Sequence, residues 1–115
     1  MNLRLNTRQV DAVKVIDLSG KITLGTESAQ LRQTIRDLVS EGNNKILLNL
    51  GDVSYVDGVG LGQLVSSFTT VSREGGQLKL LSLTRRVHDL LQITKLTTVF
   101  EIFNDEGKAL QSFNR

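Results

Sequence analysis

The stretch "VDGVGLGQL", residues 56–64, places three glycines and one aspartate where a helix is expected to begin. It follows the apolar run "KILLNL", residues 45–50, and a short loop. This order predicts a strand covered on both faces, then a loop, then a helix N-terminus. In open parallel sheets, ligands and modifications gather at such junctions because the helix presents free N–H groups there. The stretch therefore predicts both a fold and a candidate site.

Each small residue of the stretch has an expected local role. Asp57 is suited to cap the helix, and Gly58 would allow a positive φ angle. Gly60 and Gly62 would allow a strand or a partner protein to approach the helix closely. If the approaching surface belongs to a partner, Gly60→Arg is expected to abolish complex formation without unfolding the domain.

Elements downstream of the stretch alternate between helix and strand. Apolar residues at steps of three and four predict a helix from Gly58 to about Arg73, ended by "EGG" at 74–76. Residues 77–83 then read as a strand, residues from Thr84 as a short helix and residues 98–103 as a strand. A final helix is expected with Asn104 or Asp105 as its cap.

Elements upstream of the stretch complete the fold. Residues 3–18 contain two alternating stretches separated by a polar segment at 9–12, which predicts an antiparallel pair. A helix is expected from Gly25 to Gly42, with Thr26 or Ser28 as its cap. The sum predicts an α/β fold: a four- to five-stranded, mostly parallel mixed sheet with an antiparallel N-terminal strand and about four flanking helices. The strand at 45–50 should be central.

Composition narrows the class of protein. The 115 residues fit a single domain, 1–115, and their net charge of +2 is spread along the chain. Nucleic acid is therefore not an expected partner. The chain has no cysteine and no long apolar stretch, so we expect a cytoplasmic protein without disulfides or direct membrane insertion. No metal-ligand spacing occurs, and neither a metal nor a cofactor is predicted.

Three kinds of phosphate site have sequence motifs that can be compared with this chain: the Walker A loop, the dinucleotide-binding fingerprint and the phospho-accepting aspartate. No Walker A string occurs, and "GVGLG" lacks the spacing of a dinucleotide fingerprint. Asp57 would suit a phospho-accepting aspartate, but the first long strand ends in "VIDLSG" and supplies no acidic cluster for magnesium. These comparisons disfavour all three sites.

The whole pattern resembles the STAS domain, the fold of bacterial anti-sigma-factor antagonists and of the cytoplasmic tails of sulphate transporters. The resemblance runs from "VIDLSGKIT" to the last helix, and "VSYVDGVGLG" and "GGQLKLLSLTRRVHDLLQITKL" are its most specific parts. It implies a four- or five-stranded sheet with several helices. In partner-switching antagonists it also implies a cycle in which the unmodified domain binds an anti-sigma factor that is a serine kinase. Phosphorylation of the hydroxyl residue after the aspartate then breaks the complex.

The sequence departs from this pattern at the modified position. The residue after Asp57 is Gly58, followed by Val59, and neither can accept phosphate. Thr23 or Thr26 could serve as a substitute phosphoacceptor, since the loop that holds them should lie near Gly58. The simpler interpretation is that a hydroxyl there caps the helix expected from Gly25 to Gly42. Ser54 is interpreted as structural.

Two binding functions follow from the resemblance. The first is an anti-sigma-factor antagonist that engages a kinase-type anti-sigma factor and is not switched by phosphorylation at the usual site. The alternative is an assembly subunit of an ABC-type transporter or of a signalling scaffold. Either would use the same surface, whose expected residues are Thr23, Asp57, Gly58, Val59, Gly60, Leu61, Gly62 and, as exposed positions of the helix, Gln63, Ser66, Ser67 and Thr70.

Two further classes of function, an enzyme and a nucleotide-binding protein, have candidate residues in the sequence. His88 and Asp89 are adjacent, but neighbours on a helix point about 100° apart, so they do not form a catalytic triad by proximity. With no nucleophile or paired carboxylates beside them, no enzyme is predicted. A basic edge for nucleotide phosphates could form from Arg85, Arg86, Lys79 and Lys95, although solvated surface charges explain them more simply.

Overall fold

The strand β3 (Lys45–Val56) lies in the middle of a five-stranded sheet with the order β1-β2-β3-β4-β5. The computed structural model describes residues 3–114, except for the side chains of residues 26–28. β1 runs antiparallel to β2, and the other neighbouring strands run parallel. This confirms the predicted fold class and the central strand. The other elements are β1 (Leu3–Val10), β2 (Val13–Ile22), α1 (Thr26–Ser40), α2 (Gly58–Arg73), β4 (Gln77–Leu81), α3 (Arg85–Ile93), the 3₁₀ helix η1 (Leu96–Thr98), β5 (Ile102–Phe103) and α4 (Glu106–Ser112).

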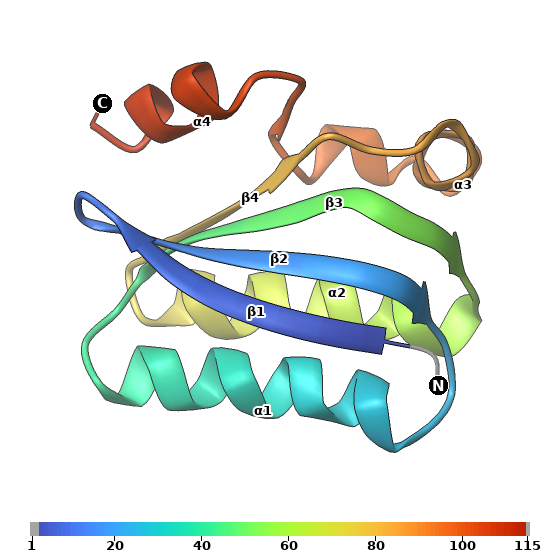
Figure 1. Ribbon diagram of the computed structural model, residues 1–115, viewed down its shortest axis with the longest axis horizontal. Helices are drawn as coiled ribbons and strands as arrows, with labels where there is room; N and C mark the ends of the chain where they lie inside the picture. The colour runs from blue at the N-terminus through green and yellow to red at the C-terminus, as the bar shows by residue number, and fades with distance from the viewer. Residues whose placement is uncertain (1–2, 115) are drawn as a thin grey trace.

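Helices cover both faces of the sheet (Figure 1). α1 and α2 lie side by side on one face, and α3 and α4 lie on the other. The larger core forms under α1 and α2, where the apolar positions of both helices meet those of the strands. Its fully buried members include Leu31, Ile35, Leu64 and Val71 from the helices and Ile16, Ile22, Ile46 and Leu48 from the strands.

β3 is longer than the sequence suggested. The residues after Leu50, where a short loop was expected before Val56, continue the strand beside β2, with Ser19 opposite Asp52 and Ile22 opposite Val56. Two register shifts between β2 and β3 accommodate the extra polar residues. Val53 and Val56 are buried while Ser54 is exposed, so the segment keeps one face on the core. The extended β3 therefore carries its end directly to the start of α2.

The strand predicted at 98–103 is mostly wrong. Only Ile102–Phe103 pairs with β4, while residues 96–98 form η1. Lys95 takes a left-handed conformation with φ 63°, which turns the chain after α3. Phe100 then packs edge-on against Phe68 of α2, with ring centroids 5.3 Å apart. β4 likewise ends at Leu81, before the predicted 83.

A smaller core holds α4 against the sheet, and a lysine sits inside it. Lys79 is only 3% exposed, and its Nζ donates to the Ser112 carbonyl at 3.1 Å and the Ser112 hydroxyl at 2.9 Å. Nζ also lies 4.7 Å from the centre of the Phe113 ring and 3.5 Å from Glu101. This polar anchor fixes the C-terminal end of α4.

Candidate functional site

The site lies where β3 meets α2, and Asp57 organises it. Its Oδ1 accepts a hydrogen bond from the Gly60 N–H at 2.7 Å, which makes Asp57 the N-cap of α2 as expected. Its Oδ2 accepts from the Leu24 N–H at 3.1 Å. The bond from Gly60, helped by that from Leu24, lowers the pKa of Asp57. One carboxylate therefore joins the β2–α1 loop to the β3–α2 turn, and the predicted proximity of the two is confirmed.

Gly60 is a packing residue of the fold. It is buried, and a Cβ built on it would lie 1.8 Å from the Ile22 carbonyl oxygen of β2. The same oxygen accepts a hydrogen bond from the Asp57 N–H at 3.2 Å. The close approach that the sequence suggested is thus one of helix to strand. The expectation that Gly60→Arg leaves the fold intact is wrong, because any side chain there displaces α2.

Gly58 and Gly62 face open space. Both are exposed, and a Cβ on either would meet no heavy atom within 4 Å. Gly58 is the first residue of α2 and does not have the positive φ that the sequence suggested. The backbone of this turn therefore has room for a side chain at residue 58.

The predicted positions of α2 divide between two faces. Gly60, Leu64, Ser67 and Val71 form its buried stripe, at steps of four, three and four. Ser67, expected to be exposed, is therefore fully buried, and its hydroxyl has no hydrogen-bond partner among the described residues. The spacing from Leu64 could have revealed this from the sequence.

The remaining predicted residues line the helix entrance to differing degrees. Val59 is 44% exposed, whereas Leu61 packs partly against the core. Gln63, Ser66 and Thr70 are half-buried. The structure thus brings Asp57, Gly58, Val59 and Gly62 to one surface and withdraws Gly60 and Ser67 from it.

The loop before α1 supplies the other half of this surface. Thr23 is half-buried, and Leu24, bonded to Asp57, is 75% exposed. Gly25, with φ 152°, takes the N-cap position of α1, which the sequence had assigned to Thr26 or Ser28. The side chains of Thr26 and Ser28 lie outside the described residues. The expectation that Thr26 is a substitute phosphoacceptor therefore stays a prediction.

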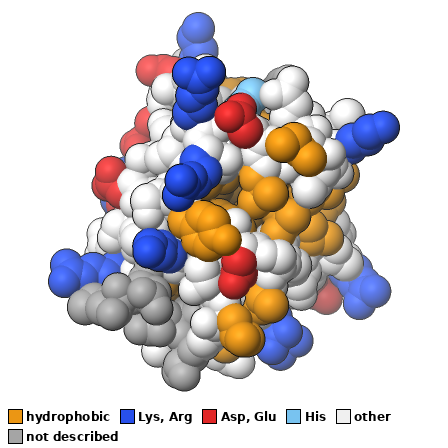
Figure 2. Space-filling model, turned by 90° about the vertical axis from the view of Figure 1, so that its right-hand side faces the viewer, with side chains coloured by type: hydrophobic (Ala, Val, Ile, Leu, Met, Phe, Trp, Pro, Cys, Tyr) orange, Lys and Arg blue, Asp and Glu red, His pale blue; other side chains and the backbone are white. Residues whose placement is uncertain are grey.

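An apolar area that sequence reasoning missed adjoins the turn. Figure 2 shows hydrophobic side chains gathered in the middle of this face, with basic and acidic side chains around them. Tyr55 is 40% exposed and Ile93 is 79% exposed. On α3 the buried positions are Val87 and Leu91, so Ile93 lies off the buried stripe. An isoleucine on the polar side of an amphipathic helix was the available signal.

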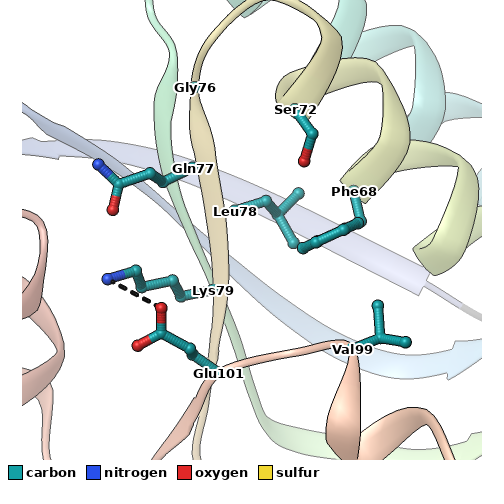
Figure 3. Close-up of a pocket in the computed structure, with 8 residues that line it drawn as sticks. All are labelled: Phe68, Ser72, Gly76, Gln77, Leu78, Lys79, Val99 and Glu101. Carbon is teal, nitrogen blue, oxygen red and sulfur yellow. Dashed lines mark ion pairs between the residues drawn. The ribbon is translucent and has the colours of Figure 1, made fainter.

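The geometry does not favour a catalytic site at His88 or the basic edge suggested by the sequence. His88 is exposed, with Nδ1 3.8 Å from Asp89, and no group of three or more metal-ligating side chains occurs among the described residues. Lys79 does not join Arg85 and Arg86 in a basic edge, because it is buried beneath α4. A hollow of about 200 Å³ near it is lined by Phe68 and Val99, and Figure 3 shows Lys79 directed away from these two toward Glu101.

A profile of the STAS domain matches residues 4–109 of the chain. The chain belongs to the STAS-domain family. This STAS domain is 32% identical over 102 residues to the anti-sigma-B factor antagonist of Bacillus subtilis, covering 89% of this chain and 92% of that relative. It is 26% identical over 111 residues to the anti-sigma-B factor antagonist of Staphylococcus aureus, covering 96% of this chain and all of that relative.

Solved structures agree on the fold of this STAS domain. An anti-sigma factor antagonist from Mycobacterium paratuberculosis superposes with a TM-score of 0.85 at 22% identity, covering 99% of this chain and 96% of that chain. Unphosphorylated SpoIIAA gives a TM-score of 0.79 at 21% identity, covering 95% of each chain. The relatives identify the anti-sigma-factor antagonists, a family of regulatory binding proteins, as the branch to which this STAS domain is similar. In the described part of the chain, none of the helices combines the length and apolarity that a membrane span requires.

Proposed function

We propose that this STAS domain is an antagonist that binds an anti-sigma factor through the exposed surface around the β3–α2 turn. The observation that carries the proposal is the double hydrogen bond of Asp57, to Gly60 and to Leu24. It holds two separate loops as one preformed surface, which reduces the ordering cost of binding. Val59 and Leu24 supply exposed apolar contacts on either side. The names of the relatives, which specify anti-sigma-B factor, support the class of partner.

The surface is proposed to bind without a phosphorylation switch at residue 58. Gly58 has no hydroxyl, and Val59 after it has none. In a switchable antagonist, phosphate would add a charge of about −1.5 to −2 at this contact and release the partner. With Gly58 the domain stays competent to bind even when its partner is a kinase-type anti-sigma factor. Thr23, the alternative acceptor in the adjoining loop, is proposed to stay unmodified.

An affinity pull-down from the native cell lysate tests the proposal. The bait is the wild-type domain, compared with Val59→Asp and with Val99→Asp as a matched control. Val59 and Val99 are 44% and 41% exposed, but Val99 lies after η1 in a separate region of the chain. An anti-sigma factor retained by wild type and by Val99→Asp, and lost with Val59→Asp, supports the proposal. Recovery of transporter or scaffold subunits would instead assign the domain to an assembly complex.

A further inference from the structure

A groove runs between α3 and the end of β3, beside the β3–α2 turn. It has a volume of about 370 Å³ and opens beside the hydrophobic area of Figure 2. Exposed apolar side chains of this size, grouped next to a groove, mark an interaction site. The lining residues are Tyr55 and Val56 from β3 and Arg86, Asp89, Leu90 and Ile93 from α3.

Basic side chains border the groove without acidic partners. The guanidinium of Arg86 lies 5.7 Å from the centre of the Tyr55 ring. Lys21 is the strand neighbour of Tyr55, and paired residues point to the same face of a sheet. Among the side chains that the structure describes, no ion pair includes Lys21, Arg85 or Arg86. Arg86 and Asp89 are the charged side chains of the lining, so Lys21, beside Tyr55, supplies the excess of positive charge at the groove.

We propose that this groove binds an acidic amphipathic segment of a partner protein. The segment inserts an apolar side chain between Tyr55 and Ile93, and its carboxylates pair with Arg86 and Lys21. The Arg86 guanidinium lies within cation–π distance of the Tyr55 ring, which favours its position over the groove for such a pair. The groove begins at Val56, directly before Asp57, so the segment extends the partner surface proposed above. Only the identity of the protein that carries this segment rests on that proposed function.

The charges favour an acidic partner over a second copy of the chain. A symmetric contact through this groove would bring the basic side chains Lys21 and Arg86 of each copy into one interface, with Asp89 of each copy as the acidic side chain of the lining. Like charges that face each other across an interface oppose association. An acidic segment meets no such penalty and removes the exposed apolar area of Ile93 from water.

An NMR titration with two synthetic peptides tests the proposal. Both are amphipathic helices with leucine on one face, and they differ only in carrying glutamate or lysine on the flanks. The glutamate peptide should shift the amide signals of Tyr55, Leu90 and Ile93 in a saturable way, and the lysine peptide should not. An exposed ion pair changes a binding constant by up to about fivefold. Arg86→Glu should therefore weaken the glutamate peptide by about fivefold or more and improve binding of the lysine peptide.

Controls separate this site from the fold and from the proposed function. Arg86 lies in the first turn of α3, where glutamate suits the helix dipole, so Arg86→Glu should keep the native spectrum. Ile93→Ser should weaken the peptide, while Val99→Asp should not. Val59→Asp, which alters the surface around the β3–α2 turn, should leave peptide binding unchanged. Equal binding of the two peptides, shifts centred outside the groove, or self-association that shifts the same amides without peptide would overturn the proposal.

Discussion

The Asp57 carboxylate lies 3.1 Å from the Leu24 amide, across 33 positions of sequence, and this bond makes one surface of two loops. The same side chain caps α2 through Gly60. An N-cap that also bonds to a second loop affects two regions when it is removed. Asp105 provides a comparison, because it caps α4 through the Lys108 N–H and, among the described residues, its side chain accepts no hydrogen bond from a second loop.

Asp57→Ala should lower the melting temperature at least as much as Asp105→Ala, since it removes one hydrogen bond more. It should also loosen the β2–α1 loop, which hydrogen exchange at the Leu24 amide would report. Partner binding should weaken in Asp57→Ala and stay unchanged in Asp105→Ala. Equal loss of binding in both variants would show that the effect is one of stability alone.

Gly60 and Gly62 should respond oppositely to alanine. Gly60→Ala places a methyl against the Ile22 carbonyl and should cost more than about 2 kcal/mol of unfolding free energy. Gly62→Ala adds a methyl in open space on α2 and should stabilise by about 0.5–1 kcal/mol. Denaturant unfolding of both variants measures this. A neutral Gly60→Ala would contradict the contact between α2 and β2.

Two buried serines should also differ in sign. The Ser67 hydroxyl has no partner, so Ser67→Ala removes an unpaired buried group and should stabilise by about 1 kcal/mol. Ser112 accepts from Lys79 and donates to the Ala109 carbonyl. Ser112→Ala should therefore destabilise by about 1 kcal/mol or more, because it weakens the anchor of a buried lysine. If Ser67→Ala were the more damaging variant in denaturant unfolding, the hydroxyl would have a function in the fold.

A cluster around Arg8 predicts the response to acid. Arg8 donates to Asp17 and to Glu106, and these hydrogen bonds are the main cause that lowers the pKa of each carboxyl. The folded pKa values lie below the unfolded values of about 4, so this stabilisation is present above about pH 4 and is lost as the pH falls further. The groups are about a third exposed, so each pair contributes at most about 1 kcal/mol.

Arg8→Met should reduce the loss of unfolding free energy between about pH 4 and pH 2, measured by urea denaturation. Arg4 is exposed on the same strand and gives the control Arg4→Met. This variant should lose as much unfolding free energy between about pH 4 and pH 2 as the wild type. If Arg8→Met lost as much unfolding free energy as the wild type over this pH range, carboxyl groups other than Asp17 and Glu106 would cause the loss of stability in acid.

The regular elements were predictable because their signals are periodic and local. The stripe of α2, the cap at Asp57 and the hairpin of β1 and β2 all follow from spacings of a few residues. The continuation of β3 past Gly51 was not predictable, since the neighbouring β2 imposes it through pairing and register shifts. Tertiary context likewise decided the burial of Lys79, whose partners lie on α4.

Within the candidate site, the sequence predicted the turn, but the expectations for Gly58, Gly60 and Ser67 were wrong. Gly60 could serve either a partner or the fold, and only the position of the Ile22 carbonyl decides between them. Ser67 was expected on the exposed surface because it is polar, but its spacing from Leu64 places it on the buried stripe. The groove was missed because it joins Tyr55 to Ile93, two residues far apart in the sequence.

The absence of a switch at Gly58 can be reversed by design. Residue 58 is exposed and open, so Gly58→Ser should fold normally and present its hydroxyl at the start of α2. With a kinase-type partner and ATP, Gly58→Ser should take up phosphate and lose binding. No phosphate uptake with a partner of demonstrated kinase activity would count against the assignment of residue 58 to the family's phosphoacceptor position.

The most direct measurement is a calorimetric titration of the recovered anti-sigma factor into the wild-type domain, before and after incubation with ATP, with mass spectrometry of residues 20–75. The account predicts the same affinity in both titrations and no phosphate on the wild-type chain. Loss of binding after ATP, together with phosphate on Thr23 or Thr26, would contradict it and show that the switch has moved to the neighbouring loop.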